Sequence, residues 1–490
     1  MRIKNIISIV LLCLNINVLA AKDFPVSLFR IHGDGKTLNT KSIQGAIDHI
    51  NQNGGGRLVF HAGRYLTGTI NLKSNVTLHL EYGATILGSL NPFDYEKTKD
   101  FPSFLFAFNQ ENIGITGKGV IDGQGKFVAR NVVANIEKGL IKDSYKYGRA
   151  SEANRPMGLY FRECKNIKIE GVTFTNSASW NQTYDQCQNL TIDAITIDNV
   201  SYWNNDGIDI VDCDKVSVTN CYIDAADDGI CLKSHDSKRF CNDIYIANNT
   251  VRSSANAIKF GTLGHGGFKN VKIINNIVFD TYRSAVALES VDSGFLENVE
   301  IDGLKVYNTG NLIFLRIGER TKKDRKSTMN NIKISNVYAE IPATKPDAGY
   351  SYEGPIEDLP RNISPAIIIT GLPGLLISDV VFENFEIRHP GGGNALYANV
   401  PLNKLNTIPE IPAQYPDFSM FKELPSWGVY IRHAKGIDFS NIEMKVDKTD
   451  FRVPIVLDDV HNSKFSGLKI NQIVNKKEIY QNNSTKIEIK

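Results

Sequence analysis

Several features are scarce in this 490-residue chain, and each scarcity argues against a class of protein. Cysteine occurs seven times and never in the C-x2-C spacing of a metal site, and we expect neither a metal nor a cofactor. The formal net charge is only +2, with both signs spread evenly, so nothing favours a nucleic-acid partner or a membrane surface. We also find no apolar run long enough to span a bilayer.

The N-terminus has the pattern of a secretory signal peptide. It begins M-R-I-K-N, continues with an apolar run from Ile6 to Leu14, and has small residues near Ala20 and Ala21. This order of charge, apolar segment and small residues is typical of such signals. We predict that residues 1–21 are removed and that the protein is exported to the periplasm or the extracellular space. The cysteines that remain could form disulfides there or lie singly inside the fold.

Residues 28–90 have the pattern of a cap at the start of the fold. Apolar residues recur at Ile43, Ala46, Ile47 and Ile50, which predicts one amphipathic helix. Short runs that alternate apolar and polar residues follow and predict strands. A helix at this place would cover the core and the backbone edge that the first coil of a stacked fold would otherwise expose.

A repeat without helical periodicity begins at Asn166. Each unit has two short alternating strands joined by a polar bend, and a third strand completes the coil. Successive units begin 23, 26, 28, 27, 28 and 33 residues apart, as in stacked-repeat proteins. They begin at Asn166, Asn189, Lys215, Asp243, Asn270, Asn298 and Asn331. We predict an all-β fold, a single right-handed parallel β-helix over residues 22–475, and a C-terminal tail over 476–490.

The repeat becomes irregular towards the C-terminus, where two long insertions interrupt it. They cover residues 344–365 and 389–427 and are rich in proline and glycine. Because long structureless connections are uncommon in compact domains, we interpret both as ordered loops over one face of the β-helix.

Two neighbouring coils carry nearly identical acidic stretches. D-G-I-D-I begins at Asp206, and D-G-I-C-L begins 22 residues later at Asp228. Equivalent positions in consecutive coils lie ~4.8 Å apart, so these two carboxylates should stack, with Asp227 beside them. Three ionised carboxylates in so small a space repel one another, which pushes their pKa values apart. The stretch therefore predicts an acid and a base for glycoside hydrolysis.

The third strand of each coil is predicted to add polar groups on the same outer face. Its third and fifth positions are always apolar and point inward, so its fourth and sixth positions should face outward. This arrangement places several cations beside the carboxylates, with Phe314 among them, and suits an anionic sugar chain. The predicted binding residues are Asn204, Asp209, Lys233, Asn256, Lys259, Glu289 and Arg316.

These motifs resemble those of glycoside hydrolase family 28, the pectin-cleaving polygalacturonases and rhamnogalacturonan hydrolases. The N-T-D-G motif of that family appears as N-N-D-G at residues 204–207, and its D-D motif appears at Asp227 and Asp228. The resemblance implies that Asp227 is the proton donor and that Asp206 and Asp228 position the attacking water. It also implies a pectic poly- or oligosaccharide substrate and inversion of configuration, for which the carboxyl groups should lie ~6.5–9.5 Å apart.

Two motifs of that family are altered here. Asn256 stands where the family has the histidine of G-H-G, and a separate G-H-G places His265 beyond the strand. Ala287 and Glu289 stand where the family's R-I-K motif binds a galacturonate carboxylate. A glutamate would repel that carboxylate. The subsite would then hold a neutral sugar such as rhamnose, or Lys259 and Arg316, the latter on the next coil, would replace the missing cations.

Two other functions stay open on the sequence alone. A pectate-type lyase on the same fold would chelate Ca²⁺ with the clustered aspartates, including Asp209, and would use Lys233 or Lys259 as its base. A non-catalytic β-helix would bind carbohydrate without cleaving it, although a binding protein has no use for a proton donor. In each case we expect a monomer.

Overall fold

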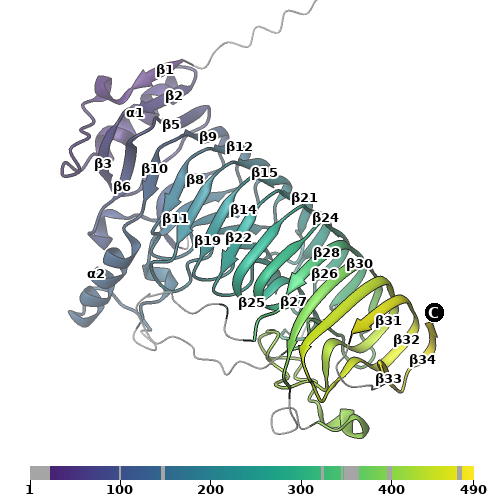
Figure 1. The fold of residues 1–490 in the computed structure, drawn as a ribbon. Coiled ribbons are helices and arrows are strands. Elements are labelled where there is room, and N and C mark those ends of the chain that lie inside the picture. The colour runs from purple at the N-terminus through teal and green to yellow at the C-terminus, as the bar shows by residue number, and fades with distance from the viewer. Residues whose placement is uncertain are drawn as a thin grey trace, which may run out of the picture.

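The protein is a long coil of strands in the computed structural model (Figure 1). The structure describes residues 22–98, 101–144, 149–321, 325–343, 346, 364–393, 400–471 and 477–490. The predicted signal peptide, residues 1–21, lies outside these ranges. The coil is a right-handed parallel β-helix, as predicted. Among the described residues, no helix combines the length and the apolar character needed to cross a membrane.

Three parallel sheets form the sides of the β-helix, and each strand pairs with its equivalents in neighbouring coils. The first sheet contains β1 (Asp23–Pro25), β2 (Gly56–Phe60), β5 (Val76–Leu80), β9 (Glu111–Gly117), β12 (Lys165–Glu170), β15 (Gln188–Asp193), β18 (Asp214–Thr219), β21 (Cys241–Ala247), β24 (Gly267–Ile274), β26 (Phe295–Asp302) and β34 (Thr485–Ile489). The second contains β3 (Gly63–Thr67), β6 (Ala84–Gly88), β10 (Val120–Asp122), β13 (Thr173–Thr175), β16 (Thr196–Asn199), β19 (Tyr222–Ala225) and β22 (Thr250–Ser253). The third contains β4 (Ile70–Asn71), β8 (Phe101–Phe108), β11 (Met157–Arg162), β14 (Gln182–Asp185), β17 (Ile208–Val211), β20 (Ile230–Ser234), β23 (Ile258–Gly264), β29 (Ile367–Thr370) and β33 (Ile479–Asn482).

Longer strands bend across the corners and belong to more than one sheet. They are β25 (Ile277–Ser290), β27 (Lys305–Ile317), β28 (Thr328–Glu340), β30 (Ile377–Gly391), β31 (Ser426–Lys448) and β32 (Val453–Asn471). A short strand, β7 (Lys97–Thr98), pairs antiparallel with β8. The 3-10 turns are η1 (Val26–Phe29), η2 (Pro92–Asp94), η3 (Glu152–Asn154) and η4 (Leu402–Thr407).

The strand ladder has the register that the repeat predicts. Ile167 pairs with Leu190, and Leu190 pairs with Val216, which reproduces the first two offsets. The later pairs are Val216 with Ile244, Ile244 with Val271, Val271 with Val299 and Val299 with Ile332. In the third sheet the aligned residues Ile208, Ile230, Ile258, Val286 and Ile313 occupy one position of consecutive coils. The predicted repeat is confirmed in both sheets.

Asparagine opens many of the units because the chain turns there with a positive φ. Asn166, Asn189, Asn270 and Asn298 have φ values of 54°, 55°, 56° and 56°, in the left-handed region that asparagine tolerates. The side-chain amide of Asn189 donates to Asn166 Oδ1 at 3.0 Å, and that of Asn298 donates to Asn270 Oδ1 at 3.1 Å. Stacked amides therefore satisfy one another along this corner.

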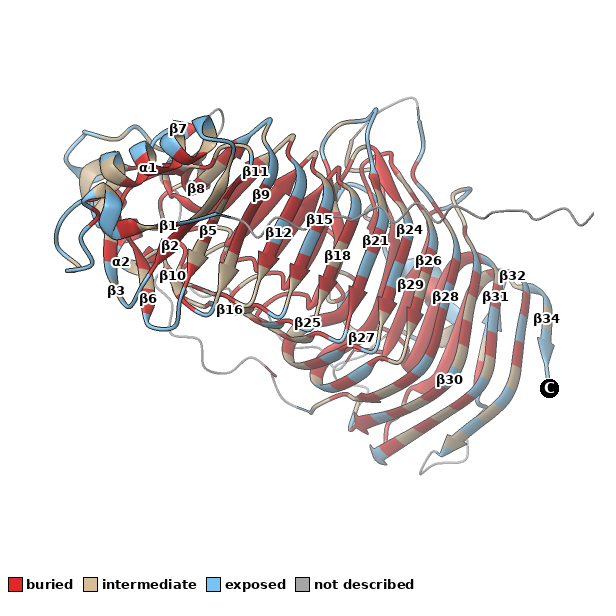
Figure 2. Cartoon of the chain, turned by 90° about the horizontal axis from the view of Figure 1, so that it is seen from above, coloured by how far each residue is buried: buried red, intermediate tan, exposed pale blue. Residues whose placement is uncertain are grey.

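A helix covers the first coil, as the sequence predicts. The four apolar residues of α1 (Thr40–Gln52) are fully buried: Ile43, Ala46, Ile47 and Ile50. Within residues 28–90 the β-helix has already begun, because β2 pairs with β5 and β3 pairs with β6. Figure 2 shows buried positions alternating along the strands that follow, as expected for a core enclosed by the coils.

The β-helix also continues past residue 475, where the sequence analysis ends it. Ile455 in β32 pairs with Ile479 in β33, and His461 pairs with Thr485 in β34. The predicted tail over 476–490 is therefore wrong for these strands. Their apolar pattern is short, but Ile479 still enters the core and is 4% exposed.

The cysteines lie inside the coils as thiols. All six that follow the predicted signal peptide are free and buried. They act as small apolar side chains in the core, which confirms the interpretation that they lie inside the fold. The alternative interpretation, that they form disulfides, is wrong.

Part of the second insertion packs against the outer face of the third sheet, and we call residues 400–425 the cover loop. Apolar side chains of the loop and of the sheet form a second buried cluster outside the coil. Its members are Ala287, Phe314, Ile368, Leu405, Ile408, Phe418, Phe421, Leu424, Tyr430, Val453 and Val456. The cover loop, which is the larger described part of this insertion, lies over one face, as predicted, whereas most of residues 344–365 lies outside the described residues.

Candidate active site

Three carboxylates converge in the turns that precede β17 and β20. Asp206 lies before β17, and Asp227 and Asp228 lie one coil later before β20. One oxygen of each carboxylate lies within 4.8 Å of the others. These are the closest approaches of single oxygen atoms, because only one coil spacing separates the two turns. The prediction that the three carboxylates cluster is confirmed, whereas the separation of ~6.5–9.5 Å between whole carboxyl groups stays a prediction.

Two glycines allow this close approach. Gly207 N–H donates to Asp228 O at 2.9 Å, which joins the two turns. A Cβ atom at Gly207 would lie 2.4 Å from Gly229 O, and one at Gly229 would lie 2.5 Å from a methyl of Val251. Glycine after each aspartate is therefore needed to stack the two acidic turns.

Asp228 is the carboxylate held most firmly in its charged form. Its Oδ2 lies 2.9 Å from Lys259 Nζ, and its Oδ1 accepts from the backbone N and the side-chain amide of Asn256 at 3.1 and 3.0 Å. Burial acts to raise the pKa of Asp228, but the charges of Lys259, Lys233 and Arg283 outweigh it and lower the pKa to about 2. Asp228 is thus an anion at neutral pH, as a base requires.

Asp227 is the most accessible of the three and has the environment of an acid. It is partly exposed, whereas Asp206 and Asp228 are each 4% exposed. Partial burial of its carboxyl, together with the negative charge of Asp228, raises the pKa of Asp227 to about 6. Its Oδ1 accepts the Asp228 N–H at 3.0 Å. The two adjacent aspartates therefore have pKa values displaced in opposite directions.

Lys233 lies between Asp206 and Asp209. Its Nζ is 3.2 Å from Asp206 Oδ2, contacts Asp209 Oδ1, and lies 4.3 Å from the centroid of the Trp180 ring. Burial raises the pKa of Asp209 to about 6, and burial with the nearby Asp209 charge raises the pKa of Asp206 well above its usual value. Lys233 is only 6% exposed, so the prediction of an open, solvent-facing cation is wrong.

The other predicted binding residues near the centre also belong to this network. Lys259 is 1% exposed, and its Nζ lies 2.7 Å from the Tyr415 hydroxyl as well as beside Asp228. Asn204 Oδ1 accepts from Arg155 Nη2 at 2.7 Å. Asn256 donates to Asp228, as described above. Contact of these side chains with a sugar stays a prediction.

Farther along the outer face, the cover loop closes the predicted groove. Arg316 is 1% exposed and donates to Gly371 O at 3.2 Å and to Glu410 O at 2.6 Å. Phe314 and Ala287 lie in the outer apolar cluster beneath the loop. These side chains do point away from the coil interior, but the insertion packs over them. The prediction that Arg316 and Phe314 line an open groove is therefore wrong.

Glu289 is buried, and it is not the charged, repelling carboxylate that the sequence analysis expects at this subsite. Burial raises the pKa of Glu289 to about 8, although the charge of Lys259 opposes the rise. Glu289 is therefore mostly uncharged at neutral pH, and the repulsion expected of a carboxylate at this place is removed. His265 lies to one side, where its Nδ1 is 3.3 Å from Asp292 O.

The structure adds groups that the repeat did not reveal. Tyr415 of the cover loop is 47% exposed, and its ring lies 5.1 Å from Lys259 Nζ, 5.9 Å from the Arg283 guanidinium and 5.8 Å from that of Arg320. Arg283 Nε also lies 3.0 Å from Asp417 Oδ2. The sequence could have indicated Arg283, because it immediately precedes Ser284, a position that aligns from coil to coil. It could not have indicated Tyr415 or Asp417, because they lie in an insertion that has no repeat.

Comparison with known proteins identifies the family. The model of glycosyl hydrolases family 28 matches residues 56–341, more than half of the chain, and this span includes all three carboxylates. The chain belongs to glycosyl hydrolases family 28. It is 30% identical over 221 residues to a probable polygalacturonase of Vitis vinifera, covering 41% of this chain and 42% of that protein. It is 27% identical over 306 residues to an exo-poly-alpha-D-galacturonosidase of Dickeya chrysanthemi, covering 52% and 50%. The chain thus spans about half the length of these curated relatives.

Solved structures of this family have the same fold. The family 28 exopolygalacturonase of Yersinia enterocolitica superposes with a TM-score of 0.65 at 18% identity, covering 96% of this chain and 78% of that one. A hyperthermoactive exopolygalacturonase of Thermotoga maritima gives a TM-score of 0.60 at 22% identity, covering 86% and 91%.

Proposed function

We propose that this protein hydrolyses the α-linked galacturonic acid bonds of a pectic polysaccharide by acid–base catalysis. The observation that carries the proposal is the cluster of three carboxylates with displaced pKa values. Asp227, which holds its proton up to a pH of about 6, protonates the departing glycosidic oxygen. Asp228 and Asp206 orient the attacking water. Family membership supports these roles.

We propose further that the reaction inverts the anomeric configuration. A retaining reaction needs a carboxylate that attacks the sugar, and Asp228 is poorly suited to this because Lys259 and Asn256 occupy both its oxygens. A water held by the carboxylates is the better nucleophile. The anomer of the first product, followed by NMR before mutarotation, tests this, and a product that retains configuration would refute it.

The groups around Tyr415 favour an acidic sugar at the subsite past the cut. Arg283 and Arg320 lie beside its half-exposed ring, and Glu289 is uncharged there at neutral pH. The reason for expecting rhamnose, repulsion by Glu289, no longer applies, and Arg316 is covered. We therefore propose homogalacturonan as the substrate. Initial rates on homogalacturonan and rhamnogalacturonan oligomers test the choice, and faster cleavage of the latter would overturn it.

A lyase reaction is the alternative to be excluded by experiment. A Ca²⁺ ion among the aspartates would compete with Lys233 and Lys259, whose ammonium groups contact Asp206, Asp209 and Asp228. We expect cleavage that persists with EDTA and releases reducing ends without the ultraviolet absorbance of an unsaturated uronate. Loss of activity with EDTA, or formation of that unsaturated product, would favour the lyase.

We also propose export, because the N-terminal pattern is that of a signal peptide. Fractionation of expressing cells tests this. The mature protein should begin near residue 21 or 22 and lie outside the cytoplasm, and intact Met1 in a cytoplasmic fraction would contradict it.

A further inference from the structure

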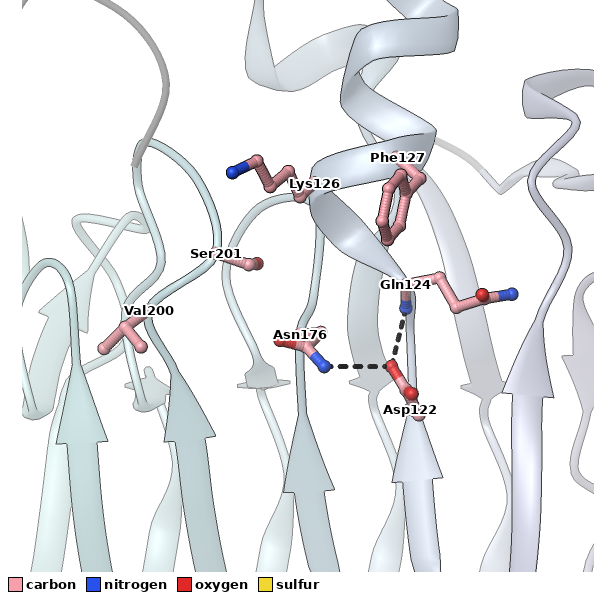
Figure 3. A pocket seen from close by; sticks show the side chains of 7 residues that line it. All are labelled: Asp122, Gln124, Lys126, Phe127, Asn176, Val200 and Ser201. Carbon is pink, nitrogen blue, oxygen red and sulfur yellow. Dashed lines mark hydrogen bonds between the residues drawn. The ribbon is translucent and has the colours of Figure 1, made fainter. Parts of the chain in front are cut away.

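A polar cavity lies on the N-terminal side of the catalytic coils. It has a volume of about 280 Å³, close to the ~300 Å³ at which ligand pockets begin. It opens where β10, β13 and β16 end, below the first turn of α2 (Gly125–Glu137) (Figure 3). The lining residues are Asp122, Gln124, Lys126, Phe127, Asn176, Val200 and Ser201.

The aromatic ring at this cavity is not needed to pack α2. The helix buries Val128, Ala129 and Val132 against the protein, whereas Phe127 is 53% exposed. Exposing most of an aromatic face to water is unfavourable unless something covers the face. In Figure 3 the Phe127 ring extends from the first turn of α2 and lies above Asp122, so one wall of the cavity is apolar.

The opposite parts of the cavity are polar and held in place. Asp122 Oδ1 accepts from the Gln124 N–H at 2.9 Å and from Asn176 Nδ2 at 3.2 Å, which fixes the floor. Lys126 reaches towards the 200–201 turn, and Ser201 points to the interior (Figure 3). One apolar ring with a carboxylate, an amide, a hydroxyl and an ammonium matches a pyranose, which has an apolar C–H face, hydroxyl edges and, in a uronic acid, a carboxylate.

The wall of the cavity is the same turn that leads to Asp206. Ser201 N–H donates to Asn205 Oδ1 at 2.9 Å, and Ser201 Oγ donates to Ser177 O at 2.9 Å. Asn205 Nδ2 donates to Ser177 O at 3.0 Å and to Ser179 O at 2.8 Å. Asp206 is the next residue. A ligand in the cavity therefore rests on a hydrogen-bonded turn whose far end carries a catalytic carboxylate.

We propose that this cavity is a second binding site for one uronic acid unit of a pectic chain, away from the bond that is cleaved. The ring face stacks on Phe127, the hydroxyls bind Asp122, Asn176 and Ser201, and the carboxylate binds Lys126. The proposal rests on the proposed function for the identity of the sugar. It predicts that long chains bind better than short ones through contacts that leave the chemistry of short substrates unchanged.

Affinity measured as a function of chain length tests this site. In an Asp227→Asn background, galacturonate oligomers of increasing length are titrated by calorimetry into the protein with and without Phe127→Ala or Lys126→Ala. We expect Phe127→Ala to weaken binding of long oligomers by about three- to tenfold and to leave dimer binding unchanged. Lys126→Ala should weaken long oligomers by about two- to fivefold, with the difference lost in high salt.

Two exposed residues near the C-terminal end of the same helix are matched controls. Leu140→Ala and Lys138→Ala remove an exposed apolar group and an exposed cation without touching the cavity, and should change nothing. Phe127→Ala and Lys126→Ala proteins that bind long oligomers as tightly as the parent would overturn the second site. The proposed function would still stand if the wild type hydrolysed homogalacturonan. Conversely, no hydrolysis by the wild type with Phe127-dependent binding would support the site and refute the enzyme assignment.

Discussion

At the scale of single residues, the surroundings of each carboxyl decide its role more than its identity does. Lys259 and Asn256 hold Asp228 as an anion, whereas Asp227 has no such cation in hydrogen-bond contact among the described residues. The same side chain can therefore serve as base in one position and as acid in the next.

Asp227→Asn should abolish most turnover and leave the fold intact. An amide cannot donate the required proton, and general acid catalysis typically contributes ~10²–10⁴-fold. Asp227 is partly exposed, so the change leaves the core undisturbed. The rate of reducing-end release from homogalacturonan, together with the circular dichroism spectrum, checks this. A variant that keeps more than about a tenth of the wild-type rate would show that Asp227 is not the acid.

The pH profile of kcat/KM should fall on both sides, and Lys259→Met should shift it to higher pH, because the Lys259 charge lowers the pKa values of both Asp227 and Asp228. Activity should be lost as pH rises past about 6, because Asp227 then loses its proton. It should also be lost in strong acid, where Asp228, whose pKa is about 2, takes up a proton. Removing the Lys259 charge raises the pKa of Asp228, so the acidic limb should shift to higher pH. The control is Lys238→Met at an exposed lysine, and an unmoved acidic limb would contradict the assigned base.

Arg320 and Glu289 should respond differently on homogalacturonan. Arg320→Ala removes a partly exposed cation near Tyr415, so KM should rise by about two- to tenfold, and by less in high salt.

Glu289→Gln should change KM little at neutral pH, because the pKa of Glu289 is raised to about 8 and the native group is already mostly neutral. If Glu289→Gln instead greatly lowered KM, Glu289 would be charged and repulsive in the working enzyme.

At the scale of elements, the cover loop is fixed to the β-helix by a group of charged side chains. Glu410 Oε1 lies 2.6 Å from Arg432 Nη2 and 3.0 Å from His433 Nε2, and His433 Nδ1 lies 2.6 Å from Asp459 Oδ2. Both nitrogens of the imidazole face carboxylates, so the protonated ring fits best. The loop carries Tyr415 to the catalytic centre, which makes this attachment relevant to substrate binding.

His433 should make the attachment of the cover loop sensitive to pH. Burial and Arg432 lower the pKa of His433, but its hydrogen bonds to Glu410 and Asp459 outweigh them and raise it. Because the pKa of His433 is higher in the folded state, protonation of His433 stabilises the attached loop. This stabilisation is complete at pH values below 6.5, the pKa of an unperturbed histidine, and is lost as the pH rises through the pKa of His433 in the folded protein. Hydrogen exchange of residues 400–425 should therefore accelerate with pH beyond the intrinsic chemical rate. His433→Gln should remove that excess, and Lys435→Gln, at an exposed neighbour, should not.

The sequence predicted the repeating strands and the α1 cap, and it missed α2 and the contacts that the insertions make. The spacing of apolar residues from Ile167 to Ile332 fixed the strand register, because each coil must bury the same positions as its neighbour. The burial of Lys233, Lys259 and Arg316 was not predictable from the alternation of apolar and polar residues along the strands. That alternation shows which side chains point out of the coil, but not whether another segment then covers them. For Lys259 and Arg316, covering depends on the cover loop, whose contacts with them join distant residues, such as Lys259 with Tyr415 and Arg316 with Glu410.

At the scale of the whole molecule, each coil contacts mainly its neighbours, so damage at one end should stay local. The α1 cap and the catalytic turns are separated by several coils (Figure 1). Among the residues that the structure describes, the first coil has no preceding coil to pair with, and α1 covers its core. Loss of the cap should therefore expose an edge that favours association, without altering the carboxylates.

Ile47→Asp tests this separation of stability from catalysis. Ile47 is fully buried on the inner face of α1, and an unpaired buried carboxylate costs several kcal/mol, enough to detach the cap. We expect size-exclusion chromatography to show oligomers or aggregates through the exposed first coil, whereas the remaining monomer cleaves homogalacturonan at nearly the wild-type rate per molecule. Lys41→Asp, which places the same charge on the exposed side of α1, should leave the protein monomeric and active. Monomeric Ile47→Asp protein without activity would contradict the expectation that damage to one coil stays local. The disturbance would then have passed through the intervening coils to Asp206.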